Sequence, residues 1–134
     1  MEHTIDSVVL AVDFDGTICT AAYPEIGRER MGAREFINQL YEDGYYIIIH
    51  TCRTDDGEYP AAQMAKDFLR IRDIKYHLFN ENAKFVIDFY GCDTRKISAD
   101  VYIDDKCLFD IPSWEEKYEI IKKRFPDPTN KNAR

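Results

Sequence analysis

Two carboxylates one residue apart are the feature of this chain most able to do chemistry. Asp13 and Asp15 follow the apolar run Val8–Val12 and precede Gly16 and Thr17. Alternation along a strand would direct both acids to the same side of a sheet. Two close carboxylates repel each other unless a cation lies between them, and hard oxygen ligands of this kind favour Mg²⁺. The alternative interpretation is a solvated strand end, where Asp and Gly only form a turn.

Polar residues also follow two further apolar runs. Thr51 comes directly after Tyr45–His50, and Asp104 and Asp105 come directly after Asp100–Ile103. The carboxyl ends of parallel strands meet along one edge of a sheet, and open α/β sheets bind their ligands at that edge. We therefore expect these side chains to share one site with the first acidic pair.

Strand-like and helix-like segments alternate between these residues. Short apolar runs typical of buried strands occupy residues 8–12, 45–50, 75–79 and 100–103, with 85–89 as a further candidate. Helical spacing of apolar residues predicts helices over residues 31–42, 60–72 and 114–124. This alternation predicts an α/β fold, a three-layer α/β/α sandwich with a mainly parallel Rossmann-like sheet.

The bulk properties favour one globular domain over residues 1–134, with residues 125–134 as a frayed tail. A net charge of −7 disfavours nucleic acid as a partner, because such binding needs clustered Lys and Arg. No apolar stretch approaches the about 20 residues of a membrane span, and residues 1–7 are too acidic and polar for a signal peptide. Four cysteines without disulfide spacing indicate reduced thiols and a cytoplasmic location.

The motif residues, taken together, resemble a known family. Residues 13–17, Asp-Phe-Asp-Gly-Thr, match the DxDGT signature of the haloacid dehalogenase-like phosphohydrolases. Thr51, Lys96 and the pair Asp104-Asp105 follow in the order of that family's other signatures. The resemblance extends from about Val8 to Asp105 and is to the small members that lack a cap domain.

The resemblance implies a role for each acid. Asp13 would be the nucleophile that forms an aspartyl-phosphate, and Asp15 the general acid and base. Mg²⁺ would be held by Asp13, Asp104 and the main-chain oxygen of Asp15, and it would screen the charge of the phosphate. Asp105 would be a further ligand or would orient Asp104. Thr51 would donate its hydroxyl to a phosphate oxygen.

Three basic residues are candidates for contacts with the phosphate. Lys96 is the lysine that the resemblance implies, and Lys84 is the alternative because the spacing of the family's lysine varies. Arg53 could bind a second phosphate or the leaving group through its planar fork of donors. A surface ion pair with Asp55 or Asp56 is the other interpretation of Arg53.

The sequence does not identify the substrate, because the family that it resembles selects substrates largely through inserted caps. Residues 19–30 leave room for a small flap only, and residues 53–95 are already used by the core. We expect a capless phosphatase for a small phosphorylated substrate or a phosphorylated macromolecule, without a membrane partner, and the tyrosines make a homo-oligomer plausible. The alternatives are a phosphatase of nucleotide or nucleic-acid ends, and a phosphorylatable signalling or scaffold module without turnover.

Overall fold

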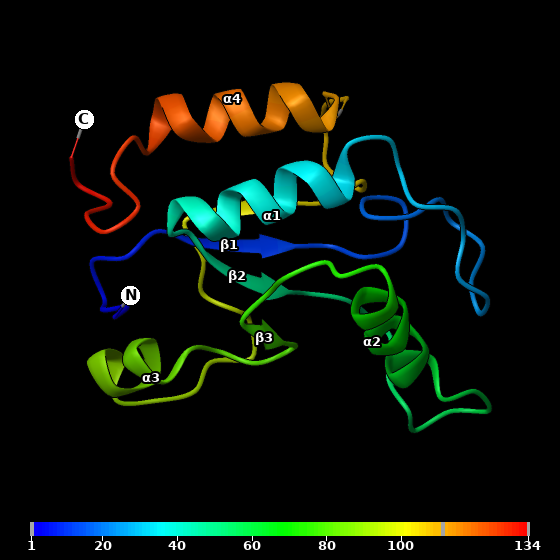
Figure 1. Ribbon diagram of the computed structural model, residues 1–134. Coiled ribbons are helices and arrows are strands. Elements are labelled where there is room, and N and C mark those ends of the chain that lie inside the picture. Colours follow the sequence, from blue (N-terminus) through cyan, green and yellow to red (C-terminus); the bar gives the residue numbers. More distant parts are fainter. Residues whose placement is uncertain (1, 111, 134) are drawn as a thin grey trace.

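The computed structural model describes residues 2–110 and 112–133 and contains a four-stranded sheet (Figure 1). Its strands are β1 (Val9–Val12), β2 (Tyr46–Ile49), β3 (Leu78–Phe79) and β4 (Val101–Ile103). Neighbouring strands are parallel throughout, in the order β3-β2-β1-β4. The strands predicted at residues 8–12, 45–50, 75–79 and 100–103 are confirmed, each with shorter bounds.

The helices of the described residues are α1 (Ala33–Asp43), α2 (Ala61–Ile71), α3 (Lys84–Tyr90) and α4 (Trp114–Arg124). The first, second and last of these confirm the helices predicted from apolar spacing. The candidate strand at residues 85–89 is wrong, because that segment lies inside α3.

Side-chain packing explains why this β-branched and aromatic segment is helical. Phe85 packs against one face of the sheet and Val86 is buried, so one side of the helix faces the core. The Nζ atom of Lys84 lies 2.6 Å from Oδ2 of Asp88, an ion pair across one helical turn. Gly91, in a left-handed conformation, ends the helix. Tertiary packing thus overrides the local preference for a strand.

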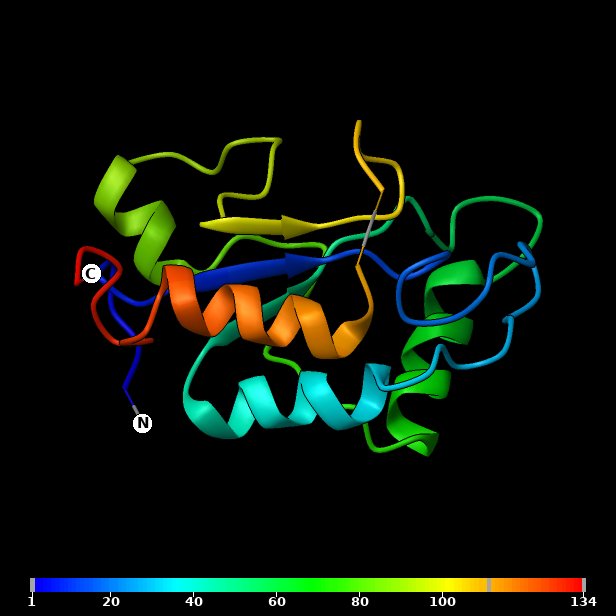
Figure 2. The same ribbon diagram turned by 90° about the horizontal axis from the view of Figure 1, so that it is seen from above.

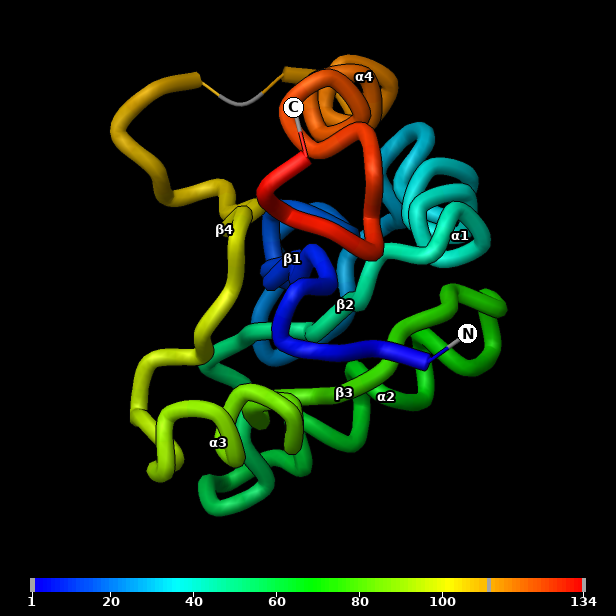
Figure 3. The backbone as a smooth tube through the Cα atoms, turned by 90° about the vertical axis from the view of Figure 1, so that its left-hand side faces the viewer, coloured from blue at the N-terminus to red at the C-terminus, as the bar shows by residue number. Residues whose placement is uncertain are grey.

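The larger core lies on the face of the sheet covered by α1, α2 and α4 (Figures 2 and 3). Leu10 and Val12 of β1 point into it and pack with Ile37 of α1, Leu69 of α2 and Ile121 of α4. Alternation along β1 sends Val9 and Ala11 to the opposite face of the sheet, where they belong to a second, smaller core.

The opposite face is covered by α3 and by the chain that leads from α3 to β4 (Figure 3). Val9, Ala11 and Ile48 form this smaller core with Ile97, and Phe85 packs against it. A sheet covered on both faces confirms the predicted three-layer α/β arrangement.

Backbone hydrogen bonds continue past the strand ends and keep the next residues aligned. The N–H of Asp13 donates to the carbonyl of Ile103 at 2.8 Å, and the N–H of His50 donates to the carbonyl of Val12 at 2.8 Å. The residues that follow β1, β2 and β4 therefore stay side by side at the carboxyl edge of the sheet.

The segment between β1 and α1 folds as a small flap. The N–H of Thr20 donates to the carbonyl of Arg28, and the N–H of Arg30 donates to the carbonyl of Ile18, both at 2.8 Å. Gly27 lets the two limbs approach, because a Cβ there would lie 1.9 Å from the carbonyl oxygen of Thr20. The expectation of a fold without a cap domain is confirmed.

The C-terminal tail is anchored, contrary to the frayed end that the sequence predicts for residues 125–134. Phe125 is buried in the larger core. The N–H of Val8 donates to the carbonyl of Pro128, and the N–H of Lys131 donates to the carbonyl of Asp6, both at 2.8 Å. The tail thus provides partners for backbone groups ahead of β1, which the sheet leaves unpaired. The last residue lies outside the described part of the chain.

The cysteines and the helix lengths complete this description. All four cysteines are free thiols, with Cys19 buried and the others exposed. Within the described ranges, every helix is too short or too polar to cross a membrane.

Candidate active site

Three carboxylates meet at the carboxyl edge of β1 and β4. Asp13 follows β1, and Asp104 and Asp105 follow β4, the strand paired with β1. Because Val12 lies opposite Ile103, the acids that follow them are brought together. One oxygen from each of the three carboxylates lies within 4.8 Å of the others. The expectation that these two motifs share one edge is confirmed.

The acidic triad, as we call Asp13, Asp104 and Asp105, is short of positive charge. Burial is the main reason that the pKa of Asp13 is raised to about 7, and a hydrogen bond with Asp105 and the charge of Asp104 raise it too. The hydroxyl of Thr17 donates to Oδ2 of Asp13 at 3.1 Å and acts in the opposite direction. A cation that binds there below about pH 7 must therefore compete with a proton.

Asp105 supplies an oxygen that is ready for a ligand. Its Oδ1 atom is buried and receives no hydrogen bond from the residues that the structure describes. Its Oδ2 atom occupies the space beside Gly16, where an added Cβ would lie 2.1 Å away. Gly16 also has a φ of +84°, which side chains disfavour. Both the close approach of Asp105 and this backbone conformation therefore require a glycine in the signature. A buried oxygen without a donor fits a bound cation, which gives the triad the donor set of a Mg²⁺ site.

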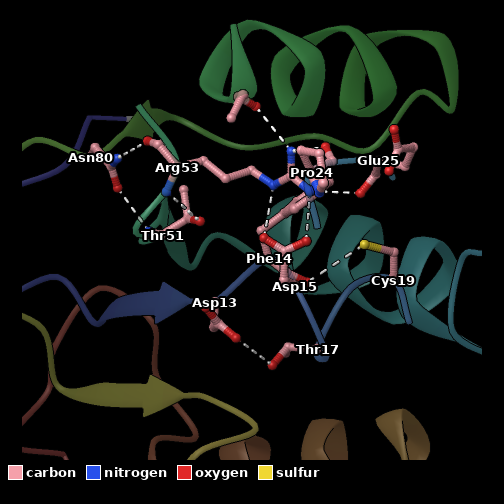
Figure 4. A network of polar contacts seen from close by, with 11 residues as sticks. Asp13, Phe14, Asp15, Thr17, Cys19, Pro24, Glu25, Thr51, Arg53 and Asn80 are labelled. Carbon is pink, nitrogen blue, oxygen red and sulfur yellow. Dashed lines mark hydrogen bonds and ion pairs between the residues drawn. The ribbon is translucent and has the colours of Figure 1, made fainter. Parts of the chain in front are cut away.

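Asp15 belongs to the same pocket but has a different partner. The strand ends at Val12, so the alternation that would send both acids to one side does not continue. Figure 4 shows Asp13 pointing toward Thr17 and Asp15 pointing toward Arg53. The two carboxylates of the signature are therefore not equivalent: one joins the triad and the other joins an arginine.

Arg53 engages all five of its N–H donors within the protein. Its Nε and one Nη2 hydrogen bind the two carboxylate oxygens of Asp15, each at 2.8 Å (Figure 4). The other Nη2 hydrogen donates to the carbonyl of Glu25, and Nη1 donates to the carbonyls of Pro24 and Ala61. Arg53 thus ties the acid to the flap and to the start of α2.

The faces of the Arg53 guanidinium are covered as well. The rings of Phe14 and Tyr23 have their centroids 5.4 and 5.0 Å from its central carbon, and the side chain is only 1% exposed. In this structure no donor of Arg53 is left for a ligand, so the predicted phosphate contact would need one of these partners to be released and stays a prediction. The alternative of a surface ion pair with Asp55 or Asp56 is wrong, because Arg53 is buried and pairs with Asp15.

Thr51 lies where the sequence predicts it, on the wall of the pocket that holds Asp13 and Asp15. Its N–H donates to Oδ1 of Asn80 at 2.8 Å, and its hydroxyl oxygen accepts from the N–H of Arg53 at 3.2 Å (Figure 4). The hydroxyl hydrogen is therefore available for a ligand. Asn80, which sequence reasoning missed, follows β3 and holds the loop after β2 in place.

The lysines are placed differently from the prediction. The Nζ atom of Lys96 lies 4.8 Å from the centre of the Tyr102 ring, and Lys84 pairs with Asp88 on the far end of the sheet. Neither lines the pocket of the signature acids. The lysine that does is Lys106, the residue directly after the acidic pair. Its position after Asp105 is a signal that the sequence offered.

The pocket formed by these residues, the signature pocket, has a volume of about 430 Å³. It is lined by residues that follow three strands and by the flap: Asp13, Asp15, Ala21, Tyr23, Thr51, Cys52, Arg53, Asp105 and Lys106. The arrangement places carboxylates, a hydroxyl donor and an ammonium group around one cavity.

No protein-family model matches this chain, and no curated protein matches it. A solved structure does: a conserved protein coded by a locus of Bacteroides thetaiotaomicron, with a TM-score of 0.76 and 33% sequence identity. The match covers 88% of this chain and 92% of that protein. With this identity over nearly the whole of both chains, the protein belongs to the same family as that conserved Bacteroides protein.

Proposed function

We propose that this protein is a Mg²⁺-dependent phosphohydrolase that cleaves phosphomonoesters through an aspartyl-phosphate on Asp13. The observation that carries the proposal is the acidic triad with its unpaired Asp105 oxygen, beside a hydroxyl and an ammonium group in one pocket. The resemblance of residues 13–17 to the haloacid dehalogenase-like signature supports the same reaction.

The metal would be held by Asp13, Asp104 and Asp105, with the main-chain oxygen of Asp15 as the further ligand that the resemblance implies. Oδ1 of Asp104 already accepts a hydrogen bond from the N–H of Lys106 at 2.9 Å, which orients that carboxylate. When bound, Mg²⁺ screens the negative charge of the phosphate from the attacking carboxylate.

Asp13 performs the first chemical step. Its carboxylate oxygen forms a bond to phosphorus as the bond from phosphorus to the ester oxygen breaks, and the leaving oxygen takes a proton from Asp15. In the second step Asp15 accepts a proton from water, whose oxygen attacks phosphorus and releases phosphate and the Asp13 carboxylate. The hydrogen bond from Thr17 fixes the rotamer of Asp13 for the attack.

Arg53 acts as a positioning residue for this proton transfer. Its fork holds both oxygens of Asp15 while each oxygen keeps a second lone pair for the substrate or for water. Its bonds to Pro24 and Glu25 also hold the flap over the pocket, which limits the entry of water.

Thr51 and Lys106 are the groups we assign to the phosphate oxygens. Thr51 has a free hydroxyl hydrogen, and Lys106 is the lysine that lines the signature pocket. Lys106 thereby takes the place that the sequence prediction gave to Lys96 or Lys84.

The test is hydrolysis of p-nitrophenyl phosphate with and without Mg²⁺. We expect activity with the metal, none with excess chelator, and a loss of at least about a thousandfold in kcat for Asp13→Asn. Asp15→Asn should slow turnover and leave a phosphoenzyme detectable by mass spectrometry. Asp56→Asn, in an exposed polar loop, is the matched control and should keep the parent rate. Full activity in chelator, or in Asp13→Asn, would reject the proposal.

The Arg53 ion pair favours a second candidate, a module that takes up a phosphoryl group and does not release it. Both oxygens of Asp15 are engaged by the guanidinium, so fewer of their lone pairs are left for a proton transfer with the leaving group or with water. Labelling with acetyl phosphate separates the two: a phosphohydrolase releases phosphate within seconds, whereas the module stays phosphorylated for hours.

A further inference from the structure

A second cavity lies next to the acidic triad, on the side away from Arg53. Its volume is about 540 Å³. It shares Ala21 and Asp105 with the signature pocket, so the two cavities adjoin. The second cavity is lined by the signature loop, the flap and the start of α4: Gly16, Ala21, Arg30, Met31, Asp105, Pro112, Ser113, Trp114 and Lys117.

Lys117 places its ammonium group on the wall of this cavity, while most of the residue is buried. The residue is only 8% exposed. Its Nζ atom lies 4.6 Å from the centre of the Trp114 ring, and it forms no hydrogen bond or ion pair with any residue in the described ranges. Burial lowers the pKa of Lys117, and the charge of Arg30 lowers it further, whereas Cys107 acts in the opposite direction. A lysine that is mostly buried and has no carboxylate partner favours an anionic ligand at the cavity wall.

Arg30 is the second cation of the cavity. Its side chain is exposed and likewise has no hydrogen bond or ion pair among the described residues. The chain carries 25 acidic residues and a net charge of −7. Among the described residues, Asp105 lines the same cavity, yet no carboxylate forms an ion pair with Arg30 or Lys117. The two cations repel each other, and an anion bound between them would offset that repulsion.

The wall that carries Lys117 is rigidly joined to the signature loop. The indole N–H of Trp114 donates to the carbonyl of Thr17 at 3.0 Å, and Trp114 is buried. Lys117 stands one helical turn after Trp114 on α4. A ligand group held there has a fixed position relative to Asp13.

We propose that Arg30 and Lys117 bind a second anionic group of the substrate, so that the substrate class is a phosphomonoester carrying a further phosphate or carboxylate. The substrate assignment rests on the proposed function, whereas the anion site itself does not. One molecule can occupy both cavities because they share Ala21 and Asp105.

The first test measures anion binding without catalysis. Inorganic phosphate is titrated calorimetrically into the protein in excess chelator, where the metal-free acidic triad repels phosphate. We expect binding by the parent protein and a loss of roughly tenfold or more in affinity for Lys117→Met and for Arg30→Gln, since each removes a charge-assisted contact. Lys123→Met, an exposed lysine of the same helix, is the control and should bind like the parent. Absence of binding by the parent, or equal binding by Lys117→Met and Arg30→Gln, overturns the proposal.

The second test identifies the substrate class with Mg²⁺ present. Three compounds share one five-carbon linker and differ at the far end: pentanediol monophosphate, pentanediol bisphosphate, and the phosphate ester of 5-hydroxypentanoate. We expect kcat/KM for the bisphosphate or the carboxylate to exceed that for the monophosphate by about tenfold or more. That ratio should fall toward one in Lys117→Met and Arg30→Gln and stay unchanged in Lys123→Met.

The outcomes separate the two proposals. Equal kcat/KM for all three compounds in the parent overturns the substrate class. Hydrolysis of none of them rejects the proposed function, while the phosphate titration still decides whether the anion site exists. The preferred compound distinguishes a phosphate from a carboxylate as the second group.

Discussion

Arg53 and Lys117 flank the acidic triad from two sides and are nearly equally buried, with exposed fractions of 1% and 8%. Arg53 has all five donors engaged by Asp15 and three carbonyls. The Lys117 ammonium group has one aromatic ring beside it and no hydrogen bond or ion pair within the described ranges. Burial alone therefore says little about the role of a cation. The count of satisfied donors separates a group that holds the site together from a group that waits for a ligand.

The two cations also have different roles around the site. Arg53 is paired with an anion of the protein itself, the Asp15 carboxylate. Its hydrogen bonds hold Asp15, the flap and the start of α2 in place. On the Lys117 side, the anion is missing, and we assign it to the substrate. Four predictions test this difference, and they follow in order of decreasing expected effect.

Arg53→Met should lower the free energy of unfolding by about 3–5 kcal/mol, because it leaves the Asp15 carboxylate and three carbonyls without their donor. Urea denaturation measures the loss. Arg70→Met is the matched control: the Arg70 pair with Asp67 is exposed, and its loss should change stability by less than about 1 kcal/mol. A loss below about 1 kcal/mol for Arg53→Met would remove its structural role.

The acids between the two cations should bind Mg²⁺ in a pH-dependent way. The pKa of Asp13 is raised to about 7, so below that pH the metal must displace a proton. The apparent Mg²⁺ affinity should therefore fall up to about tenfold per pH unit below pH 7 and level off above it.

Calorimetric Mg²⁺ titrations between about pH 5.5 and 8.5 measure this dependence. Thr17→Val removes the hydrogen bond that lowers the pKa of Asp13, so its transition should move to higher pH. An affinity that stays constant over the whole range would contradict the expectation.

Lys117→Met should raise the free energy of unfolding at neutral pH, because it removes a charge that folding partly takes out of water. The sign follows from the lowered pKa: the folded protein releases this proton at a lower pH than the unfolded chain. The parent should therefore gain stability as the pH rises toward 10.5, the ordinary value, and the variant should lack that slope.

Added phosphate provides a further test of the prediction for Lys117. It should stabilise the parent more than Lys117→Met, and so reduce or reverse the difference in melting temperature. The same melting shift with phosphate in both proteins would speak against an anion at Lys117.

Lys96→Met should have the smallest effect, within about 0.5 kcal/mol in stability. It should leave hydrolysis of p-nitrophenyl phosphate unchanged, because Lys96 lies over the Tyr102 ring and not in the signature pocket. Lys106→Met should raise KM in the same assay. A large loss in Lys96→Met with no change in Lys106→Met would return the phosphate contact to Lys96.

The strands and the acidic triad were predictable because short apolar runs form the strands and also determine where the acids lie. Each run ends in a polar residue, and parallel pairing brings Asp13 and Asp104 to one edge whatever the loops do. The segment that became α3 was not predictable from its composition. Its Phe85 and Val86 favour a strand locally, and only the sheet face that they cover makes them helical.

The basic residues were the harder part of the site. Sequence spacing places Arg53 near Thr51, but it does not reveal that the carbonyls of Pro24, Glu25 and Ala61 surround the guanidinium. Lys117 has the spacing of an ordinary helical surface residue, and its burial depends on how α4 packs. Charge and motif order thus predict the acids better than their counterions, because counterions depend on rotamers and loops.

The two ends of the described chain lie together, far from both cavities. The tail and the first residues exchange backbone hydrogen bonds before β1, and Figure 2 shows both termini on the side opposite the flap. A surface tether, an affinity tag or a fused domain attached at either terminus would project away from the flap. Immobilising the protein by an end should therefore leave both cavities open to solution, which suits it to ligand screening on a solid support.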